Sequence, residues 1–280
     1  MENIEPLVVS EVSPGYWRAT FNNPPVNALD AGTVKALHRL LTRLEGDAAA
    51  KVVVFDSADP DFFIAHFDML GDPGYFLEDQ GNGLHAWPDF TTRLAALPVL
   101  SVSVLRGRAR GVGSEFLLAT DLRFASKENA VLHQPELGMG VLPGGGALER
   151  LPSLVGRSRA LEIVMASDAF DADTAERYGW INRSLPDAEL DEFVEKLARR
   201  VASFDATVLR EAKLLINARA GLPDPQDLMA SEAAFFRTVQ YENTQATWAQ
   251  MRQHGLQEKG ALELNMADYF DQRAAEGSSR

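Results

Sequence analysis

Hydrophobic positions in the first half of the chain follow two different periods. The continuous apolar run KVVVFDS at residues 51–57 is typical of a buried strand, and VVSEV (8–12) and WRATF (17–21) predict two shorter strands. Between them, apolar residues recur at helical spacing from Val34 to Leu44, and Asp30 is suited to cap the start of that helix. The order strand, helix, strand predicts an α/β core.

A second unit of the same kind follows the first. We expect a helix over residues 91–97, a strand over 99–105, the glycine-broken turn RGRARGVGS, and a helix that starts with EFLLAT at residue 115. Residues 71–85, GDPGYFLEDQGNGLH, contain four glycines and no periodicity. That segment is therefore expected to be a mobile surface loop.

The pattern changes after about Pro152, where only helical periodicity is found. The expected helices cover residues 172–178, 188–204, 207–220, 225–251 and 261–275. The chain thus divides into a core over residues 1–200 and a helical region over 201–280. The closing residues GSSR are expected to be disordered.

Composition narrows the classes of protein that the chain can belong to. It has 280 residues, enough for a large core, and no cysteine, which excludes disulfides and thiolate metal sites. A net charge of −13 argues against nucleic acid and anionic membranes as partners. There is no signal-peptide pattern and no apolar run of roughly 18 residues, so we expect a cytoplasmic protein without a membrane span. The histidines lack ligand spacing, and no metal site is expected.

One carboxylate stands at an unusual place in this pattern. Gly107, Gly111 and Gly113 lead out of a strand into an apolar helix, where unpaired N–H groups favour an anion. Glu115 lies in the first turn of that helix. The turn does not resemble a nucleotide loop, because it lacks both GxGxxG and a following Lys-Ser or Lys-Thr.

A second carboxylate, Glu136, lies in the loop HQPELGMGVLPGGG. If DLRFAS and NAVLH form a hairpin about residues 127–129, that hairpin returns Glu136 to the level of Glu115. Two close carboxylates do not ionise together easily, so one would serve as an acid and the other as a base. The residues alone favour a plainer interpretation, in which Glu115 caps its helix and Glu136 is a solvated loop residue.

The two segments RGRARGVGSEFLLATDLRFAS and HQPELGMGVLPGGGALERL resemble the signature of the enoyl-CoA hydratase/isomerase (crotonase) superfamily. FNNPPVNALD, FFIAHFDM and AERYGWINRSLP resemble other parts of the same family, so the resemblance covers nearly the whole chain. It implies a crotonase-like spiral of ββα units with a helical C-terminal region. It also implies a homo-oligomer, a trimer or a dimer of trimers, that binds acyl-CoA thioesters.

The resemblance further implies roles for individual residues. The backbone N–H groups of Phe67 and Val112 would form an oxyanion hole for the thioester carbonyl. Glu115 would activate the water that adds at Cβ, and Glu136 would exchange the proton at Cα. The expected activity is then an enoyl-CoA hydratase, a lyase without a cofactor other than the coenzyme A of its substrate. Further contacts to the substrate are expected from Ala65, His66, Asp68 and Gly111.

Some positions depart from the family pattern. The bulky pair His66 and Phe67 stands where small residues are usual, and Val112 stands where glycine is usual, so we expect a reshaped acyl channel. His133 also replaces a residue that is commonly small. Asp68 is expected to cap a helix beginning at Met69.

Several side chains have two interpretations each. His66 and His133 either contact substrate or pack, and packing is favoured. The arginines of RGRAR either meet CoA phosphates or face solvent, with solvent favoured. Trp87, Phe90 and Leu94 line an acyl pocket or belong to the core, while Trp248, Met251 and Leu256 are expected to pack against the core or a neighbouring subunit.

Other functions remain open at this point. The same fold supports double-bond isomerisation, thioester hydrolysis and C–C bond cleavage, and a minority of the superfamily are oligomeric binding proteins, including RNA-binding ones. The acidic charge argues against RNA, and the presence of both glutamates argues for catalysis. The acyl group and the choice between trimer and hexamer are not determined by the sequence.

Overall fold

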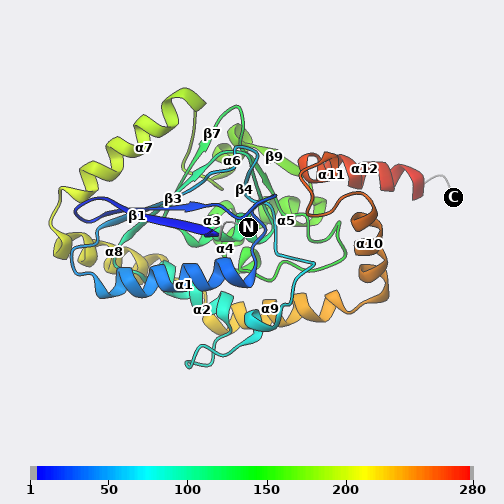
Figure 1. Ribbon diagram of the computed structural model, residues 1–280, viewed down its shortest axis with the longest axis horizontal. Helices are drawn as coiled ribbons and strands as arrows, with labels where there is room; N and C mark the ends of the chain where they lie inside the picture. The colour runs from blue at the N-terminus through cyan, green and yellow to red at the C-terminus, as the bar shows by residue number, and fades with distance from the viewer. Residues whose placement is uncertain (1–4, 278–280) are drawn as a thin grey trace.

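The computed structural model describes residues 5–277, and its strands form two sheets (Figure 1). The six-stranded sheet has the order β1-β2-β3-β5-β7-β10, and the four-stranded sheet has the order β4-β6-β8-β9. The strands are β1 (Leu7–Ser13), β2 (Tyr16–Phe21), β3 (Val52–Ser57), β4 (Phe62–Ile64), β5 (Leu100–Leu105), β6 (Arg108–Arg110), β7 (Leu122–Ser126), β8 (Val131–His133), β9 (Ala169–Asp171) and β10 (Arg183–Leu185).

Helices surround both sheets. They are α1 (Ala31–Gly46), the short 3-10 helix η1 (Gly74–Leu77), α2 (Ala86–Ala96), α3 (Val112–Ala119), α4 (Ala147–Val155), α5 (Arg157–Ala166), α6 (Ala172–Tyr178), α7 (Asp187–Ala202), α8 (Ala206–Ala220), α9 (Pro225–Val239), α10 (Glu242–Gln253), α11 (Ala261–Leu264) and α12 (Met266–Gly277). Within residues 5–277, no helix is both long and apolar enough to cross a bilayer.

The predicted first helix is confirmed in both its cap and its buried face. The Asp30 carboxylate accepts a hydrogen bond from the backbone N–H of Thr33 at 2.7 Å, which satisfies one unpaired donor of α1. Leu37 and Leu41 are fully buried in the main core. The ring of Phe116 in α3 lies 5.0 Å from that of Phe55 in β3, so this aromatic core seats α3 against the sheet.

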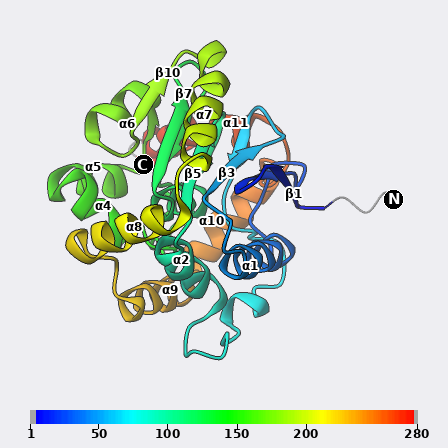
Figure 2. The same ribbon diagram turned by 90° about the vertical axis from the view of Figure 1, so that its left-hand side faces the viewer.

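The other face of the six-stranded sheet is covered by α7 (Figure 2). Val52, Val54 and Val102 project from β3 and β5 into a separate buried cluster with Leu190 and Val194 of α7. Strands β2, β3, β5 and β7 pair in parallel, and both faces of such a sheet must be buried. This explains why KVVVFDS is continuously apolar.

The expected hairpin between DLRFAS and NAVLH is wrong. β7 joins the six-stranded sheet beside β5, whereas β8 joins the four-stranded sheet in parallel with β6. The chain crosses from one sheet to the other at residues 127–130, as it also does between β5 and β6. The pairs β3 and β4, β5 and β6, and β7 and β8 each add one strand to each sheet and are followed by a helix, so the fold is the expected crotonase-like spiral of ββα units.

The expectation of helices alone after Pro152 is also wrong. β9 pairs antiparallel with β8, and β10 pairs in parallel with β7, so two short strands close the two sheets. Each is only three residues long, too short for a period to show. Pro152 itself lies inside α4.

Several boundaries differ from the predicted ones. The helix expected over residues 225–251 is two helices, α9 and α10, that meet at residues 240–241, and the one expected over 261–275 is broken at Asn265. The helix expected over 91–97 begins at Ala86. The glycine-rich segment 71–85 contains η1, whose Phe76 is buried, so it is not merely a surface loop. Residues 278–280 of the closing GSSR lie outside the described residues, and the division at residue 200 stays a prediction.

Candidate active site

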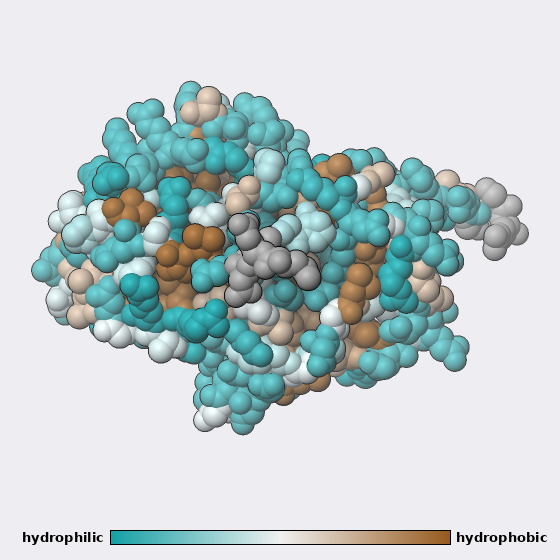
Figure 3. All heavy atoms as spheres, in the orientation of Figure 1, coloured by the Kyte–Doolittle hydropathy of each residue, from teal (hydrophilic) through white to brown (hydrophobic). Residues whose placement is uncertain are grey.

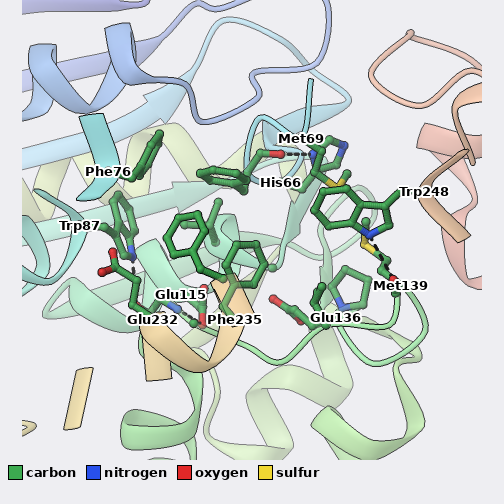
Figure 4. Close-up of a pocket in the computed structure, with 18 residues that line it drawn as sticks. His66, Met69, Phe76, Trp87, Glu115, Glu136, Met139, Glu232, Phe235 and Trp248 are labelled. Carbon is green, nitrogen blue, oxygen red and sulfur yellow. Dashed lines mark hydrogen bonds between the residues drawn. The ribbon is translucent and has the colours of Figure 1, made fainter. Parts of the chain in front are cut away.

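A pocket of about 60 Å³ lies where α3, the loop after β8, and helices α2, α9 and α10 meet (Figure 4). Its space exceeds what a single water molecule needs. Of the eight residues expected to act on or contact the substrate, six line it: His66, Phe67, Gly111, Val112, Glu115 and Glu136. Two others, Ala65 and Asp68, are not part of the lining.

Glu115 is held at the start of two helices. It belongs to the first turn of α3 and is only 2% exposed. Its Oε1 accepts the backbone N–H of Gly145 at 2.8 Å and of Ala147 at 3.1 Å, the latter being the first residue of α4. The positive end of α4 and these two donors stabilise the charged form of the carboxylate. Glu115 therefore does not simply cap its own helix.

The pKa of Glu115 reflects a balance between burial and these donors. Burial raises the pKa of this carboxyl to about 7, although the two backbone N–H groups and the charge of Arg150 act in the opposite direction. Arg150 is buried on α4 and makes no hydrogen bond with its terminal nitrogens within the described chain. A carboxyl with a pKa near neutrality can exchange a proton in either direction at physiological pH.

Glu136 lies in a poorer environment for charge. It is 5% exposed, and the side-chain amide of Gln134 approaches its carboxylate oxygens at 3.3 and 3.4 Å, long distances for a hydrogen bond. Burial and the repulsion of Glu115 raise the pKa of Glu136 well above its usual value. The interpretation of Glu136 as a solvated loop residue is therefore wrong. The pair favours a charged Glu115 beside a protonated Glu136.

The loop that carries Glu136 is fixed from both ends. The backbone N–H of Val141 donates to the carbonyl of Glu136 at 2.9 Å, closing a tight turn. Trp248 of α10 donates its indole N–H to the carbonyl of Met139 at 3.1 Å, and the hydroxyl of Thr244 donates to that of Gly140 at 2.7 Å. Trp248 thus packs within its own chain, beside the pocket.

Gly111 brings the backbone of α3 close to Glu136. Its φ is +50°, and a Cβ there would lie 2.9 Å from Oε1 of Glu136, so only glycine fits without a shift. The next residue, Val112, begins α3, and within residues 5–277 no carbonyl accepts its N–H. This donor lies at the positive end of the helix, on the lining of the pocket.

The second free donor follows from the pairing of Leu29 with residues 66–68. Leu29 donates to the carbonyl of His66 at 2.8 Å and accepts from the N–H of Asp68 at 3.0 Å. In a parallel bridge of this kind the N–H of the middle residue, Phe67, points away from Leu29. No acceptor within the described chain engages it. The ring of Phe67 packs at 4.7 Å from that of Phe76, and both residues line the pocket.

A buried ionic cluster adjoins the two segments that carry the N–H groups of Phe67 and Val112. Glu263 of α11 is fully buried and accepts hydrogen bonds from Nε2 of His66 at 2.8 Å and from Arg110. Arg110 also donates from Nε to the carbonyl of Ala65 at 3.2 Å. One carboxylate thus connects the residue before Phe67 with the strand that leads to Val112. The expectation that the arginines of RGRAR face solvent is therefore wrong for Arg110.

The remaining candidates serve the structure around the site. His133 is buried and its Nε2 lies 2.7 Å from the carbonyl of Ser167. Arg106 pairs with Asp187 and Asp191 on α7. Asp68 does not cap a helix, because a turn follows it. Its Oδ1 accepts the N–H groups of Leu70 and Gly71, both at 3.0 Å.

Two buried carboxylates were not found from the sequence. Glu263 follows Leu262, and Glu232 of α9 is followed by the apolar run AAFF; an acid among apolar neighbours is the only local signal for either. Their burial depends on partners far away in the sequence, Arg110 for Glu263 and His85 for Glu232. Trp87, Glu232 and Phe235 line the pocket, whereas Phe90 and Leu94 belong to the core.

Comparisons with known proteins identify the family of the chain. The enoyl-CoA hydratase/isomerase family model matches residues 13–261. A short-chain-enoyl-CoA hydratase of Clostridium acetobutylicum is 30% identical over 200 residues, which are 71% of this chain and 76% of that protein.

Solved structures extend the match to the fold. A candidate enoyl-CoA hydratase of Streptomyces avermitilis is 46% identical and superposes with a TM-score of 0.90, covering 95% of this chain and 96% of that one. An enoyl-CoA hydratase of Mycobacterium avium subsp. paratuberculosis shares the fold, with a TM-score of 0.78 at 24% identity over 88% of this chain and 99% of that one.

Proposed function

Because this chain belongs to the enoyl-CoA hydratase/isomerase family, we propose that it adds water across the C2–C3 double bond of a 2-enoyl-CoA thioester. The single observation that carries the proposal is the buried pair of carboxylates on one pocket. Glu115 accepts two backbone hydrogen bonds at 2.8 and 3.1 Å, whereas those that Glu136 accepts from Gln134 are longer, at 3.3 and 3.4 Å. This difference supports one base and one acid.

In the proposed reaction Glu115 takes a proton from the water whose oxygen forms the bond to Cβ. Electrons of the double bond move toward the thioester, and Cα takes a proton from Glu136. The product is a 3-hydroxyacyl-CoA that contains every atom of the enoyl thioester and of one water. Transfer of a proton from Glu115 to Glu136 restores the starting pair. Each positioned acid or base contributes about 10²–10⁴ in rate.

The N–H groups of Phe67 and Val112 are proposed to bind the thioester oxygen as negative charge develops on it. Both donors lack an acceptor within the described chain, and both residues line the pocket. One such donor is worth about 10²–10³ in rate. No separate cofactor is needed, because coenzyme A arrives as part of the substrate.

A homo-oligomer, either a trimer or a dimer of trimers, is proposed as the working state. Helix α8 buries none of its residues, and Val208 and Ile216 are 65% and 64% exposed. The face in Figure 3 is mostly hydrophilic, with hydrophobic residues in separate patches. The exposed apolar residues of α8 therefore favour a contact with another subunit. Size-exclusion chromatography with light scattering distinguishes monomer, trimer and hexamer.

The reaction is tested with purified protein and a panel of enoyl-CoA thioesters of different acyl groups. Loss of the conjugated-enone absorbance reports hydration. We expect turnover by the wild type and by Glu189→Gln, an exposed acid on α7, and a loss of about 10²-fold or more in Glu115→Gln and Glu136→Gln. No hydration of any panel member by the wild type would refute the proposal.

A further inference from the structure

A third carboxylate lines the pocket and has no part in the proposed hydration. Glu232 lies on α9, is 4% exposed, and belongs to the lining together with Glu115 and Glu136. Figure 4 shows the three in the order Glu136, Glu115, Glu232 from right to left, with Glu232 beside Trp87. A carboxylate buried among aromatic side chains requires a hydrogen-bond or charge partner.

Among the residues that the structure describes, only one of the two oxygens of Glu232 has such a partner. Oε2 lies 2.5 Å from Nδ1 of His85, which precedes α2 and is not part of the pocket lining. Within residues 5–277 no donor reaches Oε1. Burial raises the pKa of Glu232 to about 7, although His85 acts to lower it. His85 therefore holds Oε2 of Glu232 from outside the pocket and leaves Oε1 as an acceptor for another molecule.

Two adjacent glycines fix where Glu232 lies relative to the reacting carbons. A Cβ on Gly145 would meet the carboxylate of Glu115, and one on Gly144 would lie 3.4 Å from Cα of Glu232. The backbone of Glu232 is therefore close to the glycines that adjoin Glu115, and Figure 4 shows Glu115 between Glu232 and Glu136. With Glu136 at Cα and Glu115 at Cβ, the acyl chain beyond Cβ extends toward Glu232.

The side chains that line the pocket between Glu115 and Glu232 are apolar. Phe76, Trp87 and Phe235 line the pocket there and suit a hydrocarbon chain or ring. A carboxylate oxygen at its end accepts a hydrogen bond from a donor. We propose that Glu232 recognises a hydroxyl group at the far end of the acyl group, so the preferred substrates are 2-enoyl-CoA thioesters whose acyl chain or ring ends in a hydroxyl. This inference rests on the proposed hydration for its placement of Cα and Cβ.

The test uses pairs of thioesters of equal length, one ending in a hydroxyl and the other in a methyl group, including pairs with a phenol and a tolyl ring. Hydration gives kcat/KM for each 2-enoyl-CoA. Binding of the saturated acyl-CoA, which cannot react, is measured by calorimetry. We expect the wild type to favour the hydroxyl member of at least one pair by about 10- to 100-fold, because a hydrogen bond to a charged group is strong.

Glu232→Leu should abolish this preference, whereas Asp227→Asn, an exposed acid on the same helix, should keep it. Glu232→Gln preserves the shape of the side chain, and should weaken the preference several-fold because a neutral amide accepts a weaker bond. His85→Ala retains the carboxylate and should retain a preference.

The inference is overturned if the wild type treats both members of every pair alike in hydration and in binding. It is also overturned if Glu232→Leu and Glu232→Gln lower kcat/KM and binding affinity equally for both members of each pair. That result is expected if Glu232 only joins α9 to His85 at the start of α2. A preference in binding without hydration of any pair supports the role of Glu232 and refutes the proposed reaction instead.

Discussion

The substitution Glu263→Gln is expected to destabilise the protein and to disturb both proposed oxyanion donors. Glutamine keeps the size of the side chain and an acceptor for the N–H of Gln257, which Glu263 now accepts at 2.7 Å. It removes the negative charge that faces His66 and Arg110. Arg110 is itself 2% exposed, so its charge would be left buried without a counterion.

The magnitude follows from the electrostatics of Glu263. Burial alone would raise the pKa of this carboxyl, but attraction by His66 and Arg110 outweighs burial and lowers the pKa to about 2. Relative to a usual value of 4.5, this contributes about 3 kcal/mol to the free energy of unfolding at neutral pH. Removing one partner of a buried ion pair costs about 3–5 kcal/mol, which agrees.

Urea unfolding followed by tryptophan fluorescence measures this loss. The control is Glu258→Gln, an exposed acid in the turn before α11, which should change the free energy of unfolding by less than about 0.5 kcal/mol. Because the pKa of Glu263 is lowered in the folded state, its contribution is complete above about pH 4.5. In the wild type it should be lost as the pH falls from there to about 2.

Glu263→Gln should also lower the catalytic activity. His66 precedes Phe67, and Arg110 leads to Val112, so displacing both turns should lower kcat by up to about 10²–10³ in protein that is still folded. An unfolding midpoint and a kcat equal to those of Glu258→Gln would refute the view that Glu263 supports the two donors.

Three further predictions concern the base, the glycine beside it and the core. The pKa of Glu115, about 7, predicts that kcat/KM falls as the pH drops below about 7, and a flat pH profile from 5 to 8 would contradict that role. Gly145→Ala places a Cβ against the carboxylate of Glu115 and should abolish hydration, while the circular dichroism spectrum remains that of the folded protein. Full activity of this variant would show that the carboxylate of Glu115 is not held beside Gly145. Phe116→Ala empties a fully buried site between four phenylalanine rings and should cost about 3–5 kcal/mol in urea unfolding, and a loss below about 1 kcal/mol would argue against this packing.

Local features of the fold were predictable from the sequence because local physics determines them. The apolar run of β3 and the periodicity and cap of α1 are properties of neighbouring residues. Pairing between strands is not. β7 and β8 were correctly expected as strands, but a hairpin and a crossover leave the same local pattern, and only pairing with the preceding turn of the spiral decides between them.

The candidate site divides in the same way. Glu115 and Glu136 were predicted to lie together from a glycine turn and a family resemblance, although the hairpin offered as the reason was wrong. Glu232 and Glu263 were missed because their burial depends on His85 and Arg110, more than a hundred residues away. A single acid within a helix carries no sign of such a partner.

The central claim is that Glu115 and Glu136 together add one water to the double bond. The most direct test is conversion of a 2-enoyl-CoA in water enriched in deuterium and in oxygen-18, followed by mass spectrometry. We predict a 3-hydroxyacyl-CoA with the heavy oxygen at Cβ and one deuterium at Cα, formed at least about 10²-fold more slowly by either glutamine variant. A product without the heavy oxygen, or one formed by both variants at the wild-type rate, would contradict the claim.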